Sequence, residues 1–270
     1  MPKKVQSSCL REFKVPRTLA NWLENADLTP KTRFFLDDFD RLLDYCWQNN
    51  GMVLLPITRY FPRDAVSAMN QLLHEPDLFK ERITQLSTSF VHFFYCAAWF
   101  LGLFDIAPGL KLVMLERALT FSVCSALQKF TILFDSLWSK IRWQALQGNP
   151  NGRPDGVQDY RNQLAYFLAR INVGERIKFR SLLAGSATNS AENDKEMVCL
   201  DTLNFTMNHG VFPNRIMPLL KRMDLVDFDY VKPGEMHASH YFLEISWIQV
   251  MPIGKKIFRS IGNLREPRSR

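Results

Sequence analysis

The sequence has no apolar run that is long enough to cross a membrane. Its most apolar segment, FVHFFYCAAWFLGLF at residues 90–104, has 15 residues and contains His92. A helix that spans a bilayer needs about 20 apolar residues, so this segment is expected to be a buried helix. The basic N-terminus is not followed by an apolar run, so no secretory signal is expected. We therefore expect a cytoplasmic protein (nuclear if eukaryotic) with no membrane partner.

Cysteine is sparse and is not arranged in any recognised pattern. The five cysteines are an odd number, and no two have the spacing of a metal site or of a redox motif. Scattered cysteines of this kind are typical of proteins in a reducing compartment. We expect all five to be free thiols packed as small hydrophobic residues: Cys9, Cys46, Cys96, Cys124 and Cys199.

Recognised enzyme motifs are lacking as well. There is no glycine-rich phosphate loop, no G-x-S-x-G and no dinucleotide fingerprint. His237 and His240 are two candidate metal ligands, but a zinc site needs three or four, so we expect polar loop residues instead. His92 lies four residues before Cys96 in the most apolar segment, which favours a core histidine with satisfied hydrogen bonds. We therefore expect no catalytic residue, no metal and no cofactor, and the prediction leans away from an enzyme.

The acidic cluster DDFD, at residues 37–40, is likewise expected to have no catalytic role. At helical spacing Phe39 points inward, while Asp37, Asp40 and Asp44 share the side that faces solvent. A solvated helix face is therefore favoured over a catalytic pair of acids.

What the chain does have is an uneven excess of positive charge. It carries 34 Lys and Arg against 27 Asp and Glu, a net charge of +7. Residues 1–135 contribute +1 and residues 136–270 contribute +6. Six basic residues and one acid follow from position 255 to the end. A basic end of this kind is either a solubilising tail or a contact for phosphate.

The N-terminal half reads as a helical domain, residues 1–146. Thr29 and Pro30 begin a helix at TPKTRFFLDDFDRLLDYCWQN, and Pro62 begins another. A long apolar helix is expected at 83–101, then two short extended runs around Pro108-Gly109, then one long helix over 116–146. Because the helix at 83–101 is apolar nearly all round, five of its residues should be buried: Phe94, Ala97, Ala98, Phe100 and Leu101.

A linker separates this domain from the rest of the chain. QGNPNGRPDG, at 147–156, has three glycines, two prolines and no apolar side chain. Helices are expected at 157–171 and 174–184, and a flexible loop at 185–195. We therefore place the second domain at 157–270.

The last part of the chain has a specific order of elements. EMVCLDTLNFTMNHG and VFPNRIMPLLKRM predict two helices, DLVDFDYV and HYFLEISWIQVM predict two strands around Pro233-Gly234, and PIGKKIFRSIG predicts a closing helix. This order, over 196–262, resembles the winged helix-turn-helix family. Met251-Pro252-Ile253-Gly254 resembles the T-P-x-G opening of that family's last helix, with methionine in place of threonine. The expected fold is mainly α, with a C-terminal winged-helix domain that contains a two-stranded hairpin.

The resemblance implies that this domain binds duplex DNA, with the second helix in the major groove and the wing near the backbone. The function expected is that of a DNA-binding protein in a regulatory role, such as transcription regulation, or in a plasmid- or phage-type role. The expected contact residues are Asn214, Arg215, Lys221, Arg222, Lys232, Lys255, Lys256 and Arg259. Of these, Asn214 and Arg215 suit base edges, and the lysines suit phosphates.

Two alternatives stay open. Asp224, Asp227, Asp229 and Glu235 make the first strand and the wing acidic, and winged helices also serve as protein-interaction modules. In this alternative the wing and the helical N-terminal half form a scaffold that holds a protein partner or a second copy of the chain in a homo-oligomer. An enzyme without a sequence signature is the weaker alternative.

Two segments of the N-terminal half are similar to segments of the C-terminal motif. YFPRDAVSAMNQLL parallels VFPNRIMPLLKRM, and LGLFDIAPG parallels MDLVDFDYVKPG. We interpret the first copy as a degenerate winged helix, with chance similarity as the alternative.

Overall fold

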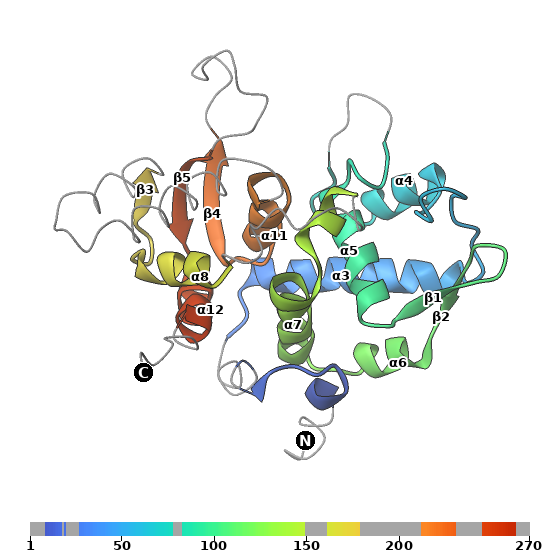
Figure 1. The fold of residues 1–270 in the computed structure, drawn as a ribbon, viewed down its shortest axis with the longest axis horizontal. Helices are drawn as coiled ribbons and strands as arrows, with labels where there is room; N and C mark the ends of the chain where they lie inside the picture. Colours follow the sequence, from blue (N-terminus) through green and yellow to red (C-terminus); the bar gives the residue numbers. More distant parts are fainter. Residues whose placement is uncertain are drawn as a thin grey trace, which may run out of the picture. The chain divides into compact units, whose positions relative to one another are not determined.

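The computed structural model describes residues 9–17, 19, 27–77, 83–148, 161–178, 212–230 and 245–262. They are mainly α-helical, as expected, and carry two small antiparallel sheets (Figure 1). The chain divides into two compact units, Met1–Asn151 and Gly152–Arg270, called unit 1 and unit 2 below. The division falls inside the stretch 147–156 that the sequence marks as a linker.

Unit 1 contains the first predicted helix, α3 (Pro30–Gln48). The Thr29 side chain caps it, because its Oγ1 accepts a hydrogen bond from the backbone N of Thr32 at 3.2 Å. One apolar stripe of α3 faces the core and is buried, as helical spacing predicts: Phe35, Leu36, Phe39, Leu42, Leu43 and Cys46.

The next two helices are α4 (Arg63–Gln71), which follows Pro62, and α5 (Ser89–Phe100). Helix α5 is shorter than expected, because the chain turns at residues 85–87 before it begins. Phe94, Ala97, Ala98 and Leu101 are buried as predicted. The prediction for Phe100 is wrong, because this residue lies in the last turn with 51% of its surface exposed. Among the described residues, no helix combines the length and the apolar character that crossing a membrane requires.

A small sheet follows α5. Strands β1 (Phe104–Ala107) and β2 (Lys111–Met114) form the predicted hairpin around Pro108-Gly109. Gly109 has a φ of 77°, a conformation that glycine adopts without steric cost. The extended segment 51–54 pairs with the other edge of β2, since Leu112 N donates to Met52 O at 2.9 Å and Leu54 N donates to Leu110 O at 2.9 Å.

The predicted single helix over 116–146 is wrong. The structure has α6 (Glu116–Ser122), α7 (Ala126–Asp135), a π-helical turn (Ser136–Lys140) and a 3-10 turn (Trp143–Gln147). The break comes from a capping box that starts α7, in which Gln128 N donates to Ser125 Oγ and Ser125 N donates to Gln128 Oε1. This S-x-x-Q signal is visible in the sequence.

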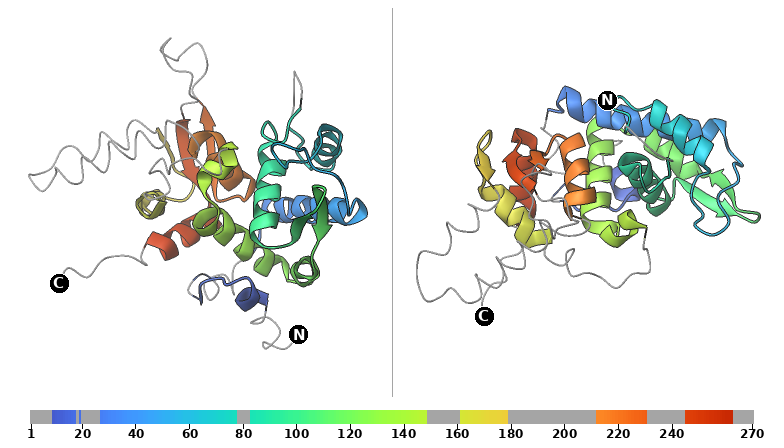
Figure 2. Two further views of the ribbon diagram at one scale, coloured as in Figure 1. Left: turned by 45° about the vertical axis from the view of Figure 1, so that its right-hand side comes forward. Right: turned by 90° about the horizontal axis from the view of Figure 1, so that it is seen from above.

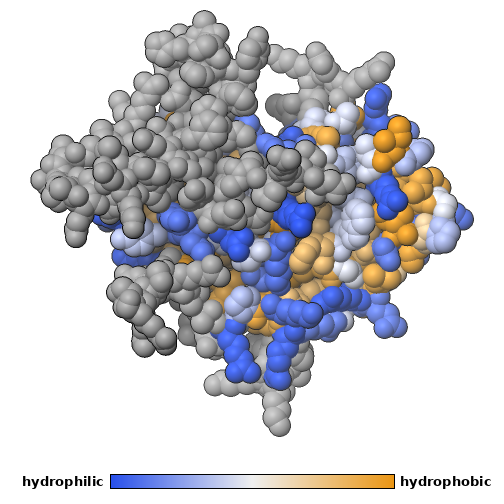
Figure 3. All heavy atoms as spheres, viewed as in Figure 1, coloured by the Kyte–Doolittle hydropathy of each residue, from blue (hydrophilic) through white to orange (hydrophobic). Residues whose placement is uncertain are grey.

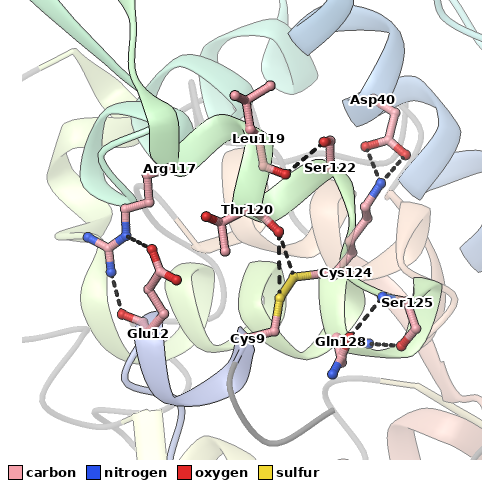
Figure 4. Close-up of a disulfide and its surroundings, with 11 residues drawn as sticks. Cys9, Glu12, Asp40, Arg117, Leu119, Thr120, Ser122, Cys124, Ser125 and Gln128 are labelled. Atoms are coloured by element: carbon pink, nitrogen blue, oxygen red, sulfur yellow. Dashed lines mark hydrogen bonds and ion pairs between the residues drawn. A yellow bond between two sulfur atoms is a disulfide. The ribbon is translucent and has the colours of Figure 1, made fainter. Parts of the chain in front are cut away.

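The N-terminal segment 9–17 is fastened by a disulfide (Figure 4) and by contacts with α6 and with the π-helical turn after α7. Cys9 and Cys124 form a disulfide across a sequence separation of 115 residues, so the expectation of five free thiols is wrong for these two. Phe13 is buried against Phe121, with ring centroids 5.9 Å apart. Lys140 Nζ donates to the Phe13 carbonyl at 2.7 Å. A covalent bond, an aromatic contact and a hydrogen bond thus hold the same short segment.

Unit 2 is a three-stranded sheet with helices. Its described elements are α8 (Arg161–Arg170), β3 (Arg176–Lys178), a π-helical turn η4 (Phe212–Ile216), α11 (Met217–Arg222), β4 (Val226–Tyr230), β5 (Ile245–Val250) and α12 (Pro252–Gly262). The strand order is β3-β5-β4, and both pairings are antiparallel. Helices α8 and α12 pack side by side (Figures 1 and 2).

Two expectations for unit 2 change. The helix predicted at 174–184 is wrong at residues 176–178, because these residues form β3. Since β3 pairs with β5, the expected two-stranded hairpin is part of a three-stranded sheet. Gly174, with a φ of 80°, lies in the turn between α8 and β3. The helix predicted at 196–210 and the wing with Lys232, His237 and His240 lie outside the described residues.

The two units share an order of elements. In unit 1, α3 is followed by the edge segment 51–54, then by α4 and α5, then by the hairpin. In unit 2, α8 is followed by the edge strand β3 and, after the undescribed stretch 179–211, by α11 and the hairpin. In both, the edge segment pairs with the second strand of the hairpin. Helix α5, not α4, therefore holds the place in unit 1 that α11 holds in unit 2.

Candidate nucleic-acid interface

The helix expected to enter the major groove is formed by η4 and α11. Its apolar residues face inward, and Phe212, Ile216 and Leu220 are buried. Pro218 has no N–H to donate to the carbonyl four residues earlier, and the wider π-helical turn lies immediately before it. Asn214 and Arg215, the residues expected to read bases, are half-buried on this turn.

The basic end of α11 is tied to the sheet. Lys221 Nζ forms an ion pair with Asp227 Oδ1 at 2.7 Å and donates to the Phe228 carbonyl at 3.0 Å. The same ammonium lies 5.2 Å from the centroid of the Phe228 ring. Arg222, beside it, is half-buried. Asp227 is one of the acids that argue against DNA binding in the sequence, and its charge is partly neutralised by Lys221.

Lys255 serves the fold of unit 2. Its side chain is buried, and its Nζ donates to the Ile171 carbonyl at 2.5 Å. Burial lowers the pKa of Lys255, the nearby Arg259 guanidinium lowers it further, and Glu175 acts in the opposite direction. The ammonium is thus engaged with the end of α8, and it helps to fix α12 against that helix.

Four other cations of unit 2 are exposed. Lys256 and Arg259 lie on α12, Arg170 ends α8, and Arg176 begins β3. Arg170 lies 5.7 Å from the ring centroid of Tyr166. None of the four forms an ion pair with another described residue.

Arg176 is a candidate that sequence reasoning missed. Its guanidinium carbon lies 4.3 Å from the ring centroid of Trp247 on β5, and its Nε donates to Gln249 Oε1 at 3.4 Å. The sequence predicted Arg176 in the helix at 174–184, whereas both partners lie on a strand more than 70 positions later in the chain. The alternation of basic and apolar residues at Arg176, Ile177 and Lys178 was the strand signal that could have found it.

The two units differ in net charge. The described residues of unit 2 include ten Lys and Arg against four Asp and Glu, a net charge of +6. Those of unit 1 include thirteen against twelve, a net charge of +1. Unit 1 also pairs many of its charges, as Asp40 with Lys129 at 2.7 Å and Asp135 with Lys140 at 2.6 Å. The available positive charge is thus concentrated in unit 2.

His92, four residues before the half-buried Cys96, is part of the core of unit 1, as predicted. His92 is buried, its Nδ1 meets Gln85 Nε2 at 3.1 Å, and its Nε2 meets the Ala145 carbonyl at 2.8 Å. Burial raises the pKa of Cys96 to about 12. A raised pKa of this kind disfavours the thiolate, which is the nucleophilic form of cysteine.

The acidic cluster on α3 is more engaged than predicted. Asp37 and Asp44 are exposed, but Asp40 is half-buried beside Lys129, and burial raises its pKa. Asp38 is buried and accepts hydrogen bonds from the backbone N and from Nδ1 of His74, at 2.8 and 2.7 Å. Among the described residues, no three His, Cys, Asp or Glu gather as a metal site would require.

No family model matches the chain, and no curated protein or solved structure matches it.

Proposed function

We propose that unit 2 is a winged-helix domain and that it binds duplex DNA. The observation that carries the proposal is the net charge of +6 on its described residues, with exposed cations that no described acid neutralises. Duplex DNA carries one negative charge for about every 1.7 Å of its axis, so a surface of this kind gains affinity by releasing counterions.

The arrangement of unit 2 supports the winged-helix part of the proposal. Helix α11 leads directly into β4, β5 pairs with β4, and α12 follows β5. The edge strand β3, which precedes this group in the chain, pairs with the other side of β5. Gly254 permits α12 to begin close to the sheet, because a Cβ at this position would lie 2.0 Å from the Leu225 carbonyl oxygen.

The basic residues divide into three roles under this proposal. Arg215, near the start of the recognition helix, reads base edges. Lys256 and Arg259 on α12 contact phosphates, and Lys255 holds α12 in place through the Ile171 carbonyl. A chain that binds DNA in this way suits a regulatory role, in transcription or in a plasmid or phage.

The test is the binding of a fluorescein-labelled duplex, followed by anisotropy at two salt concentrations. Arg215→Ala should cost about 1–3 kcal/mol and relax the preference between sequences. Lys256→Ala should weaken binding to all sequences alike and lower the salt slope by about one. Lys111→Ala is the matched control, because Lys111 is an exposed lysine of unit 1. This variant should leave the affinity for duplex and the salt slope unchanged.

The wild-type result decides the proposal. Non-specific DNA binding has a Kd of about 1–100 μM at physiological salt. If the wild type binds no duplex more tightly than about 100 μM even at low salt, the DNA-binding function is wrong. If it binds but Lys111→Ala weakens it as much as Lys256→Ala, the assignment to unit 2 is wrong.

A protein-contact role is the second candidate, and the surface of unit 1 favours it. Hydrophobic residues gather on this unit on the side where β1 and β2 lie (Figure 3). Val53, Leu55 and Ile57 are exposed, and Ile57 keeps 96% of its surface accessible. A second copy of the chain is the simplest partner for such a patch. Sedimentation of wild type and of Ile57→Ser tests it: loss of self-association in the variant supports contact between copies, and a monomeric wild type contradicts it.

A further inference from the structure

We propose that the open face of the β3-β5-β4 sheet binds single-stranded nucleic acid by stacking an unpaired base on Arg176 and Trp247. This inference rests on the proposed function and extends it to a second surface of unit 2. It implies that unit 2 holds a strand of an opened duplex, and not only a closed one.

Among the described residues, one face of the sheet is buried, and the other, called the open face, carries exposed or half-buried side chains. Val226, Phe228, Ile248 and Val250 are buried. The alternate residues point the other way: Arg176 is paired in register with Gln249, and Gln249 with Asp227. Asp229 is likewise paired with Trp247. Arg176 and Asp229 are exposed, and Trp247 and Gln249 are half-buried.

Arg176 is held over Trp247. The distance of 4.3 Å from the guanidinium carbon to the ring centroid is the shortest cation–aromatic distance found among the described residues. A long hydrogen bond of 3.4 Å from Nε to Gln249 Oε1 adds a second contact. A guanidinium that already lies against a ring loses less entropy when a base stacks on it.

Charge changes sign across this face. The edge strand β3 carries Arg176, the central strand β5 contributes Trp247 and Gln249, and β4 carries Asp227 and Asp229. Asp227 is paired with Lys221, whereas Asp229 is exposed. Phosphates are therefore attracted to the β3 side and repelled from the β4 side. A strand bound here should run its backbone along β3 and direct its bases over β5.

The stacking surface favours an unpaired base. Bases in a duplex are stacked on one another and present only their edges in the grooves. An unstacked base presents its flat face, which stacks on aromatic rings and on arginine guanidinium planes. The ligand class is therefore single-stranded DNA or RNA without strong sequence preference.

The experiment uses the full chain and two fluorescein-labelled probes, an oligothymidylate of about 16 nucleotides and a duplex. Trp247→Ala should weaken oligothymidylate binding about 5- to 150-fold, the usual worth of one stacked base. Trp247→Phe, which keeps a ring, should recover most of that loss. Arg176→Lys keeps the charge but has no plane, so it should weaken binding without changing the salt slope.

Trp99→Ala is the matched control, because Trp99 is a tryptophan of unit 1 with 42% of its surface exposed. It should bind both probes as the wild type does. If the wild type binds duplex while Trp247→Ala and Arg176→Lys bind oligothymidylate as tightly as the wild type, the inference is overturned and the proposed function stands. If the wild type binds neither probe, the proposed function fails and the inference fails with it.

Discussion

In unit 1, Lys129 and Asp40 meet at 2.7 Å and Lys140 meets Asp135 at 2.6 Å, whereas in unit 2 Lys256 and Arg259 are exposed on α12 without a described acid beside them. The described elements of both units nevertheless include a helix, an edge segment, a further helix and a hairpin in that order. The order of elements therefore does not decide the chemistry of the surface. Side chains that point away from the core are free to differ between two units that share such an order.

The helix before each hairpin shows the same contrast. In unit 1 this helix is α5, which is buried over most of its length and holds His92 in the core. In unit 2 it is α11, which is short and ends with Lys221 and Arg222. Helix α5 is therefore enclosed along most of its length, whereas α11 ends in two half-buried basic residues.

The largest expected effect tests whether the aromatic core belongs to unit 1 alone. Phe94 is fully buried, with its ring centroid 4.9 Å from that of Phe39. Phe94→Ala should lower the free energy of unfolding by about 3–5 kcal/mol, because it removes buried surface and leaves a cavity. Hydrogen exchange should show lost protection in α3 and α5, with α8 and α12 unchanged. Phe100→Ala, at an exposed position, should change stability by less than about 0.5 kcal/mol. Equal loss of protection in both units would contradict their independence.

The disulfide gives the next largest effect, and it is also confined to unit 1. Replacing Cys9 and Cys124 with serine removes a link across 115 residues. Urea unfolding should show a loss of about 2–5 kcal/mol, the usual range for a native disulfide. A reductant should destabilise the wild type by a similar amount and leave the double variant unchanged. Alkylation of Cys9 in the native protein under non-reducing conditions would show that the bond does not form.

The smallest effect compares one tyrosine in each unit. Tyr95 donates to the Arg59 carbonyl at 2.9 Å, and Tyr230 donates to the Pro213 carbonyl at 2.8 Å. Burial raises the pKa of both hydroxyls above their ordinary 10.0, that of Tyr230 to about 12. A raised pKa means that the folded state holds the proton more tightly. Each tyrosine therefore contributes its full stability below pH 10. For Tyr230 this contribution is lost as the pH rises from about 10 to 12, and for Tyr95 the loss likewise begins at about pH 10.

The corresponding variants should separate the two units. Tyr230→Phe should cost about 0.5–1.5 kcal/mol at neutral pH and should remove part of the alkaline loss of stability in unit 2. Tyr95→Phe should do the same in unit 1. Hydrogen exchange at pH 8 and at pH 10.5, corrected for intrinsic rates, measures both. An unchanged alkaline loss in both variants would contradict the assignment.

Local signals in the sequence predicted many of the helices and strands. Thr29 and Pro30 identified the start of α3, Pro62 identified α4, and Pro108-Gly109 identified the hairpin of unit 1. Each of these signals acts within a few residues, so the sequence contains both partners of the interaction side by side. The capping box at Ser125 and Gln128 was equally local and was overlooked.

The candidate interface depended far more on contacts between distant residues. The sequence identified Lys255, Lys256 and Arg259 as one basic group, but only the fold shows that Lys255 is buried on the Ile171 carbonyl while the other two are exposed. Arg176 and Trp247 are 71 positions apart, and they meet because β3 pairs with β5.

The sequence by itself determined the mainly helical character, the hairpins and the basic C-terminal half, because propensity, capping and net charge are properties of short segments or of composition. The tertiary structure alone decided that Cys9 meets Cys124, that β3 completes the sheet, and which cations stay exposed. These outcomes depend on which distant segments bury each other's apolar surface, and that choice is made by the packing of the whole unit.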